Sequence, residues 1–204
     1  MQTKKRVSQA NYEIRAKYDD YSIVVYQAFS DAIADAALAS GMFVTPFSYN
    51  RMTWVKPSFL WLMERSNWGA KPGQERTLAI RICRSGWDEA LALGVLTHPI
   101  PKIHKTVEDW NRLFEAATVH VQWDPERDLR GVTQSNYSIQ VGISRHLIER
   151  YVNEWVLEIT DLTADVRKMR NLIRAGRAGQ AKSFLPPERI YPVSPETAKR
   201  IGMG

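Results

Sequence analysis

The chain has 204 residues, of which 44% are hydrophobic and 25% are charged. These values are ordinary for a globular protein, and the length is enough to bury a core within one domain. No stretch approaches the length of a membrane-spanning helix, so we expect no membrane partner. The lone cysteine, Cys83, excludes a disulfide within the chain and indicates a reducing compartment, which predicts a cytoplasmic protein.

The net charge of +6 is concentrated in the last part of the chain. From Leu162 onward, nine Lys and Arg residues stand against three acidic ones, which accounts for the whole excess. Such a region can attract nucleic acid or another polyanion, although solvated helix faces are often basic as well. The candidate nucleic-acid contacts are Arg167, Arg170, Arg174 and Arg177.

Secondary-structure signals are clear near the start of the chain. β-Branched residues predict a strand at 22–27, and Ser30 or Asp31 can cap a following helix that Gly41 ends. The stretch 51–66 then alternates as a strand does before Pro57, which suits the first position of a helix. The next predicted elements are a half-exposed strand at 77–83 and a short helix at 87–93.

The second half of the chain shows similar signals. Thr106 and Asp109 resemble a capping box for a helix that reaches Ala117, and residues 124–128 are expected to form a charged turn. Residues 155–159 fit either a helix or a strand. The other predicted elements are strands at 119–123 and 137–143, helices at 146–153 and from Thr163 to Gly176, and an extended proline-rich segment at 184–195.

Strands and helices are mixed without the regular alternation of a parallel sheet, which predicts the α+β class. We expect a single domain over residues 12–193, with a mixed, mainly antiparallel sheet flanked by helices. Residues 1–11 and 194–204 are expected to be terminal extensions.

The predicted helix start at 56–58 is a candidate anion site. Free backbone N–H groups and the positive end of the helix dipole favour a phosphate there, beside Lys56 and Ser58. The alternative is that Lys56 merely caps a buried helix and Ser58 donates back to the backbone.

Three further constellations contain polar side chains in strand contexts. Tyr26 and Gln27 end an apolar strand, Glu126 belongs to a carboxylate-rich strand exit, and Gln140 lies inside a strand where its amide needs partners. A carboxylate such as Glu126 could stabilise a developing cation or accept a proton. In each case, the alternative is an ordinary turn or a hydrogen bond within a sheet.

Other kinds of chemistry have little support in the sequence. The four histidines lack the paired spacing of a zinc helix and no cysteine pair accompanies them, so we expect no metal site. His120 has apolar neighbours typical of a structural histidine, and Cys83 is expected to be a packed thiol. No glycine-rich phosphate loop of either common type is present.

A family resemblance covers almost the whole chain, from Ile14 to Pro192. The chain resembles the bacterial and fungal proteins grouped as domain of unknown function family 4291. This resemblance implies a domain boundary rather than an activity. The runs that carry it are IRAKYDD, VVYQAFSDAIADAAL, RMTWVKPSFLWLMERS, KPGQER, VQWDPERDL, SIQVGIS and LPPERIYP.

A more distant resemblance suggests chemistry. The run VVYQAFSDAIADAALASGMF is similar in layout to the opening of ADP-ribosyltransferases, in which a strand ends in Tyr-His or Tyr-Arg before a polar turn and a helix. Gln27 stands where that pattern has His or Arg. The resemblance implies that Thr53 or Trp54 packs on the nicotinamide, that Arg51 and Lys56 neutralise the pyrophosphate, and that Glu126 is the catalytic glutamate, a place that Gln140 or Glu158 could equally occupy.

These resemblances lead to three functional hypotheses. The first is an enzyme that binds NAD as its cofactor and transfers ADP-ribose, with nucleic acid on the basic, Trp-rich surface as a candidate acceptor. The second is a non-catalytic nucleic-acid-binding module whose tryptophans stack on bases. The third is another enzyme that acts on a nucleotide or phosphate ester and uses the region of Lys56.

Overall fold

The computed structural model describes residues 11–203 and arranges their strands in three sheets. A five-stranded mixed sheet has the order β1 (Asn11–Tyr12), β8 (Thr133–Ile143), β7 (Val119–Arg127) and β6 (Gly94–Leu96), with β4 (Thr53–Val55) also paired to β8. An antiparallel sheet has the order β3 (Ser22–Phe29), β5 (Arg76–Cys83) and β9 (Val156–Asp161). A third sheet pairs β2 (Arg15–Ala16) with β10 (Arg189–Ile190).

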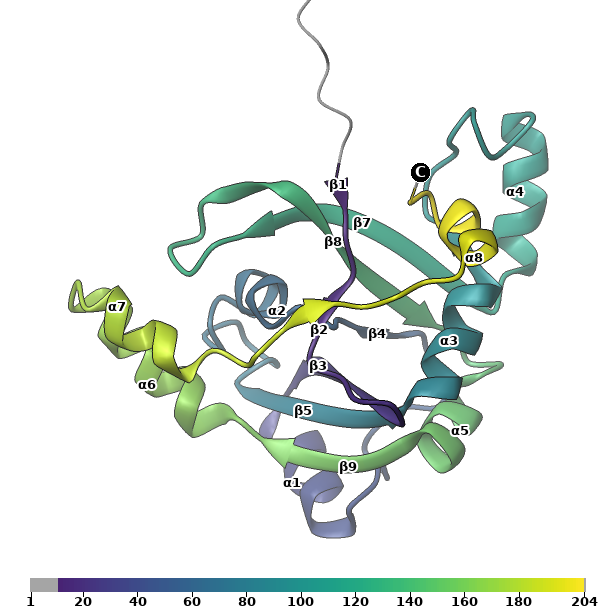
Figure 1. Cartoon of the computed structure of the whole chain (residues 1–204). Coiled ribbons are helices and arrows are strands. Elements are labelled where there is room, and N and C mark those ends of the chain that lie inside the picture. Colours follow the sequence, from purple (N-terminus) through teal and green to yellow (C-terminus); the bar gives the residue numbers. More distant parts are fainter. Residues whose placement is uncertain (1–10, 204) are drawn as a thin grey trace, which may run out of the picture.

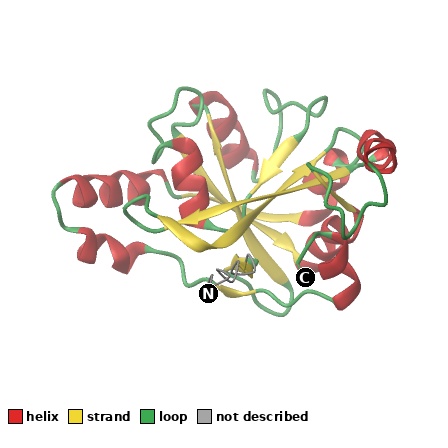
Figure 2. Ribbon diagram, turned by 90° about the horizontal axis from the view of Figure 1, so that it is seen from above, coloured by secondary structure: helices red, strands yellow, loops and turns green. Residues whose placement is uncertain are grey.

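Helices surround these sheets, as the view from above shows (Figure 2). Figure 1 places α6 and α7 at one side of the molecule and α4 and α8 at the other. The helices within the described residues are α1 (Asp31–Ser40), α2 (Phe59–Ser66), α3 (Arg84–Leu93), α4 (Val107–Ala116), α5 (Ile148–Arg150), α6 (Thr163–Arg174), α7 (Ala178–Ala181) and α8 (Pro195–Arg200). A π-helical turn at Tyr151–Trp155 continues α5, and a 3-10 turn at Lys182–Phe184 follows α7.

The two larger sheets meet at one point of the backbone. Tyr26 on β3 and Lys56, just after β4, exchange backbone hydrogen bonds of 2.7 and 3.3 Å. Helix α2 follows Lys56 and lies between the β7–β8 hairpin and the sheet of β3, β5 and β9 (Figure 1). The prediction of a single α+β domain is therefore confirmed, while the expected single sheet is divided into three.

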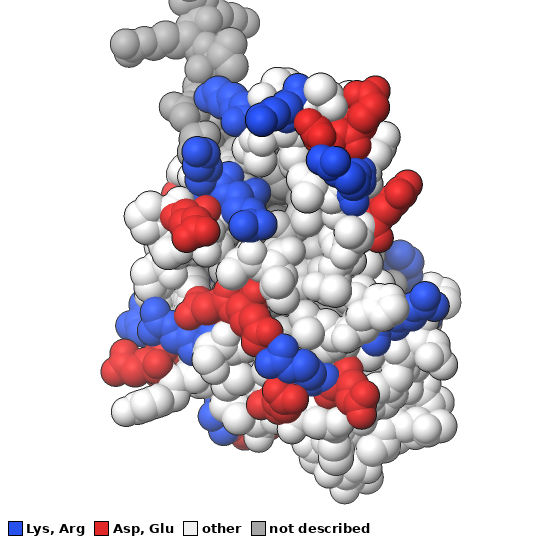
Figure 3. Space-filling model, turned by 90° about the vertical axis from the view of Figure 1, so that its right-hand side faces the viewer, with Lys and Arg blue, Asp and Glu red and all other residues white. Residues whose placement is uncertain are grey.

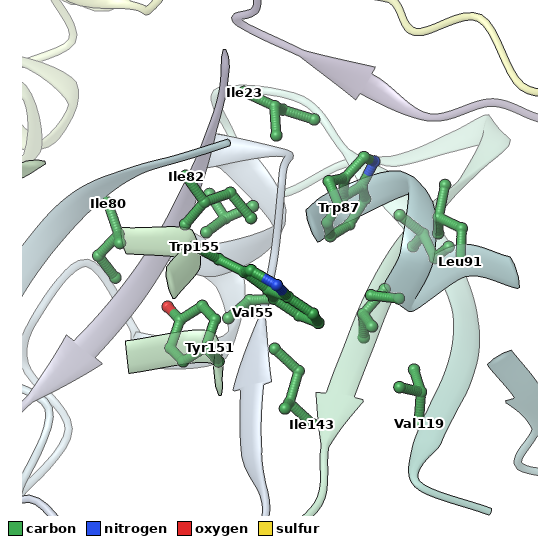
Figure 4. Packing of buried hydrophobic residues seen from close by; sticks show 14 of the residues in the cluster. Ile23, Val55, Ile80, Ile82, Trp87, Leu91, Val119, Ile143, Tyr151 and Trp155 are labelled. Atoms are coloured by element: carbon green, nitrogen blue, oxygen red, sulfur yellow. The ribbon is translucent and has the colours of Figure 1, made fainter. Parts of the chain in front are cut away.

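The main core lies where both large sheets meet α3 and the π-helical turn (Figure 4). Trp87, Tyr151 and Trp155 are all buried there. Gly86 allows the close approach, since a Cβ atom at that position would lie 2.4 Å from the Trp155 ring. This packing orients Tyr151, whose hydroxyl group reaches β3.

Most predicted helix ends agree with the structure. Gly41 ends α1 with a left-handed φ of 70°, and the Thr106 side chain caps α4 by accepting from the Asp109 N–H. Four starts differ by one to three residues, since α3 begins at Arg84 and not at 87, and α5 begins at Ile148 and not at 146. Pro57 precedes the capping residue Ser58 instead of taking the first helical position, and Thr163 is the first residue of α6, where its hydroxyl accepts from the Thr77 N–H.

The prediction of a charged turn at 124–128 was wrong, because β7 continues to Arg127. Strand β6 pairs with β7 only as far as Val121, so the rest of β7 has no strand partner on that side among the described residues. An edge position tolerates Pro125, which lacks an N–H group. The register then shifts between Pro125 and Arg127, which marks a bulge.

The end of the chain packs against the domain. Helix α8 begins at the Ser194 cap, Ile201 is fully buried in the core, and its carbonyl accepts from the Trp123 indole at 2.6 Å. The expected extension at 194–204 is thus an integral part of the fold as far as residue 203, whereas residues 1–10 lie outside the described residues. None of the described helices is long and apolar enough to cross a membrane.

Candidate functional site

A pocket of about 450 Å³ opens between β3, β4, α2, the loop at 71–74 and the paired strands β7 and β8. The structure therefore joins segments that the sequence suggested only separately. The residues that the sequence singled out and that line this pocket are Gln27, Arg51, Thr53, Trp54, Lys56 and Gln140.

Gln27 fixes the floor of the pocket. Its amide nitrogen donates to the Thr53 hydroxyl at 2.6 Å and to the Trp54 carbonyl at 3.2 Å, and its amide oxygen accepts from the Tyr151 hydroxyl at 3.0 Å. Burial raises the pKa of Tyr151, which keeps this donor protonated. The polar side chain at the end of β3 thus ties β3 to β4 and to the core.

A carboxylate behind the pocket holds two lining amides. Asp124 accepts from the amide nitrogens of Gln122 at 2.8 Å and Gln140 at 2.7 Å, and these two glutamines lie opposite each other on β7 and β8. The partner that a buried Gln140 required is therefore Asp124. Neither glutamine's amide oxygen has a donor among the described residues, which leaves both oxygens free to accept hydrogen bonds from a ligand.

Lys56 is the buried cation of the pocket, with 7% of its surface exposed. Burial lowers its pKa to about 8, the positive charge of Arg65 adds to this fall, and Asp124 opposes it. Within residues 11–203, its ammonium group has no ion-pair partner. A large fraction of Lys56 is therefore a neutral amine near pH 8.

Three more cations stand at the rim of the pocket. Arg51, Arg65 and Lys71 line it and are exposed, and none of them forms an ion pair with another described residue. No Asp or Glu side chain of the described residues lines the pocket. Four positive side chains thus converge on one concave surface, an arrangement that attracts anions.

At the helix start, where the sequence predicts an anion, the chain itself supplies partners for two backbone N–H groups. The Ser58 hydroxyl accepts from the Trp61 N–H at 3.2 Å and caps α2, and the Phe59 N–H donates to Glu188 at 2.7 Å. A carboxylate of the chain itself therefore occupies the place expected for a phosphate. Ser58 does bond to the backbone, but its hydroxyl oxygen accepts from the Trp61 N–H, whereas the alternative had the hydroxyl donating.

Glu126 does not line the pocket, although Gln122 and Asp124 on the same strand lie at or behind it. The bulge after Pro125 interrupts the alternation of β7, and the buried Glu126 carboxylate accepts from its neighbour's N–H instead. Burial raises the pKa of Glu188 to about 8, and the charge of Glu126 adds to this rise while the Phe59 N–H opposes it. Glu126 therefore acts on Glu188 and not on the pocket.

Tyr26 points away from the pocket that Gln27 lines, as expected for adjacent strand residues. It lines a separate pocket of about 300 Å³, together with Glu158, which pairs with Arg81 at 2.9 Å. The structure therefore separates Tyr26 and Glu158 from the other predicted site residues.

The arginines of α6 and Arg177, which follows it, do not converge on a pocket. Arg167, Arg174 and Arg177 are exposed, whereas Arg170 donates to the Trp68 carbonyl at 3.3 Å. On the opposite side of the molecule, which carries α3 and α8, acidic and basic side chains are interspersed (Figure 3). A nucleic-acid contact at α6 therefore rests on three exposed arginines.

The tryptophans give little support to base stacking. Trp61 and Trp123 are 5% and 6% exposed, so the predicted stacking role is excluded for both. Trp87 and Trp155 are buried in the core as well. Trp54 is half-buried and lines the pocket, where a planar group of a ligand can contact it.

Sequence reasoning missed several residues of the site. Arg65 lies three residues after Leu62 and lines the pocket with it, so helical spacing was the available signal. Asp124 had been assigned to a turn, and Gln122 required knowledge of its cross-strand partner. Lys71 and Gln74 come from a loop whose path the sequence does not specify.

The histidine and cysteine residues were considered as metal ligands or reactive groups. Among residues 11–203, no group of three or more His, Cys, Asp or Glu side chains is arranged to hold a metal ion. The His120 ring stacks on Phe114 with centroids 4.4 Å apart, and burial lowers its pKa. Cys83 is half-buried on β5, with its sulfur 4.0 Å from the Glu154 carbonyl oxygen.

Residues 13–191 match the model of a protein family described as Domain of unknown function (DUF4291). The chain belongs to this family. The match includes every residue that lines the cationic pocket, so the pocket lies within the family's domain. No curated protein matches the chain in a sequence search.

Proposed function

We propose that this DUF4291 protein is an enzyme that acts on a phosphate-bearing small molecule of the nucleotide class, bound in the cationic pocket. The observation that supports this most strongly is the convergence of Arg51, Lys56, Arg65 and Lys71 on a surface that no described carboxylate lines. Guanidinium and ammonium groups form strong, charge-assisted hydrogen bonds with phosphate oxygens.

The shape and composition of the pocket fit a ligand of this size. Its volume of about 450 Å³ lies within the range of small-molecule sites. The rim cations suit the phosphates, while Trp54 and the amide oxygens of Gln122 and Gln140 suit a ring that carries hydroxyl or amino groups. Lys56, at the buried end, supplies an amine that can act as a base or a nucleophile.

ADP-ribose transfer from NAD is a second candidate. The specific observation in its favour is that Gln27, Thr53 and Trp54 line the same pocket as Arg51 and Lys56, as the resemblance to ADP-ribosyltransferases implies. No described carboxylate lines the pocket, and Asp124, which holds the lining amides of Gln122 and Gln140 from behind, would stabilise the ribosyl cation in this candidate.

Calorimetric titration with ADP, NAD and adenosine tests the proposal. We expect ADP to bind and adenosine, which lacks phosphate, to bind at least about tenfold more weakly. Equal affinity for ADP and adenosine, or no binding of either, would contradict a phosphate site. Chromatography of the NAD mixture then separates the two candidates, since only ADP-ribose transfer releases nicotinamide.

A further inference from the structure

The amine of Lys56 and the three rim cations differ in their surroundings. Lys56 is buried at the inner end of the pocket, next to strands that hydrogen bonds fix in place, whereas Arg51, Arg65 and Lys71 are exposed at its mouth. Exposed cations are sufficient to hold a phosphate. A buried lysine without an ion-pair partner among the described residues has a desolvation cost that phosphate binding alone does not explain.

The surroundings of Lys56 favour the neutral, nucleophilic form of its amine. Burial acts first, and the charge of Arg65 on α2 adds to it. Asp124 on β7 opposes them, but it is already held by Gln122 and Gln140. At pH 8, an amine with a pKa of about 8 has a neutral fraction on the order of 100-fold larger than an exposed lysine does.

We propose that Lys56 forms an imine with the carbonyl carbon of a phosphorylated aldehyde or ketone held in this pocket. The phosphate of such a ligand binds at the rim cations and its carbonyl group reaches inward to the amine. This inference rests on the proposed function, because it uses the same cations to hold the phosphate.

The chemistry needs no co-reactant. The lone pair of the Lys56 nitrogen forms a bond to the carbonyl carbon, a proton moves from nitrogen to oxygen through water, and a carbinolamine results. The nitrogen lone pair then forms the second carbon–nitrogen bond as the carbon–oxygen bond breaks, and the hydroxyl group takes a proton from solvent and leaves as water. The product is the iminium ion, and loss of its nitrogen proton to solvent gives the neutral imine. Water reaches the site because the pocket is open at its mouth. An iminium ion formed in this way is an electron sink for chemistry at the adjacent carbon.

Pyridoxal 5′-phosphate is a direct probe, because it combines an aldehyde with a phosphate. The full-length protein is incubated with the probe at pH 8, reduced with borohydride and digested, and the labelled lysines are identified by mass spectrometry. We expect Lys56 to be labelled at least about tenfold faster than any exposed lysine. Pyridoxal, which lacks the phosphate, should label Lys56 at least about tenfold more slowly than its phosphate ester does.

Two variants provide the comparison. Lys56→Met keeps the aliphatic volume and should lose the fast phase of labelling, while Lys102→Met, at an exposed loop position, should retain it. Uniform labelling of all lysines in the wild-type protein, or a fast phase that survives in Lys56→Met, would overturn the imine. The wild-type peptide map gives this answer even if Lys56→Met does not fold.

A parallel titration with ADP separates this inference from the proposed function. ADP binding without preferential labelling of Lys56 would contradict the proposed imine but not the proposed phosphate site. Preferential labelling of Lys56 that ADP suppresses would support both. If ADP does not bind and labelling is uniform, both are wrong.

Discussion

Lys56 in the pocket and Ser58 at the start of α2 lie two residues apart in the chain, and the sequence suggested a bound anion beside each of them. At the helix start, the Phe59 N–H donates to Glu188 and Ser58 caps the helix, so the chain satisfies its own donors. In the pocket, Lys56 and its neighbouring cations have no ion-pair partner among the described residues. Positive groups therefore indicate a ligand site only where the chain itself supplies no acceptor or carboxylate for them.

Removal of two rim cations is expected to have the largest effect, which is a loss of ADP affinity in the pocket. The double variant Arg51→Ala, Arg65→Ala should raise the dissociation constant of ADP about 100-fold, because each change removes a charge-assisted hydrogen bond to phosphate. Calorimetry measures the change. The matched control is Arg167→Ala, Arg174→Ala on the exposed face of α6, which should bind ADP like the wild type. Equal losses in both double variants would mean that only net charge matters.

The contact between Glu188 and the start of α2 can be tested through the pH dependence of the free energy of unfolding. The pKa of Glu188 is raised from 4.5 to about 8 in the folded protein, so the folded state binds more protons than the unfolded state between these values. Its stabilising contribution is complete below about pH 4.5 and is lost as the pH rises through 8.

Glu188→Gln keeps an acceptor for the Phe59 N–H but cannot ionise. The free energy of unfolding should therefore fall less between pH 5 and 8 in the variant, by about 1–2 kcal/mol after allowance for partial exposure. Urea unfolding at several pH values measures this. Identical pH dependence in both proteins would show that Glu188 ionises normally in the folded state.

The neighbours of Lys56 should shift its pKa in opposite directions. Asp124→Asn removes a charge that favours the ammonium form and should lower the midpoint below about 8, whereas Arg65→Gln should raise it. We expect shifts of about half a unit to one unit. The pH dependence of Lys56 acetylation, followed by mass spectrometry, gives the midpoints. Shifts in the same direction would contradict this electrostatic account.

The smallest expected effect concerns α6. Reversal of charge in Arg167→Glu, Arg174→Glu, Arg177→Glu should change ADP affinity less than about twofold, because these side chains are exposed and do not line the pocket. The same variant tests the nucleic-acid prediction. If α6 binds nucleic acid, the slope of affinity against salt concentration should become flatter, and an unchanged slope would show that the basic face is only solvated.

Local signals in the sequence were sufficient for much of the fold. The strand at 22–27, the helix capped by Thr106 and the extended proline-rich segment were predicted because their signals act over a few residues. The continuation of β7 through Pro125 was missed because it depends on β6 ending early, which is a tertiary fact. Likewise, the burial of Ile201 depends on a distant partner, Trp123.

The candidate site was predictable in part for the same reason. Gln27 and Gln140 were noticed because polar residues interrupted apolar strands, and Lys56 because it stood at a predicted helix start. Glu126 was chosen from its strand exit, and the bulge that turns it away has no clear local signature. The role of Asp124 appears only when Gln122 and Gln140 are paired across two strands.

The most direct measurement of the central claim is a two-dimensional NMR titration of the nitrogen-labelled protein with ADP. The account predicts that the Trp54 indole and the Gln140 side-chain amide, which line the pocket, shift as ADP binds. The buried indole of Trp123, bonded to Ile201, should stay unchanged. Shifts confined to α6, or no shift at saturating ADP, would contradict a phosphate-binding pocket.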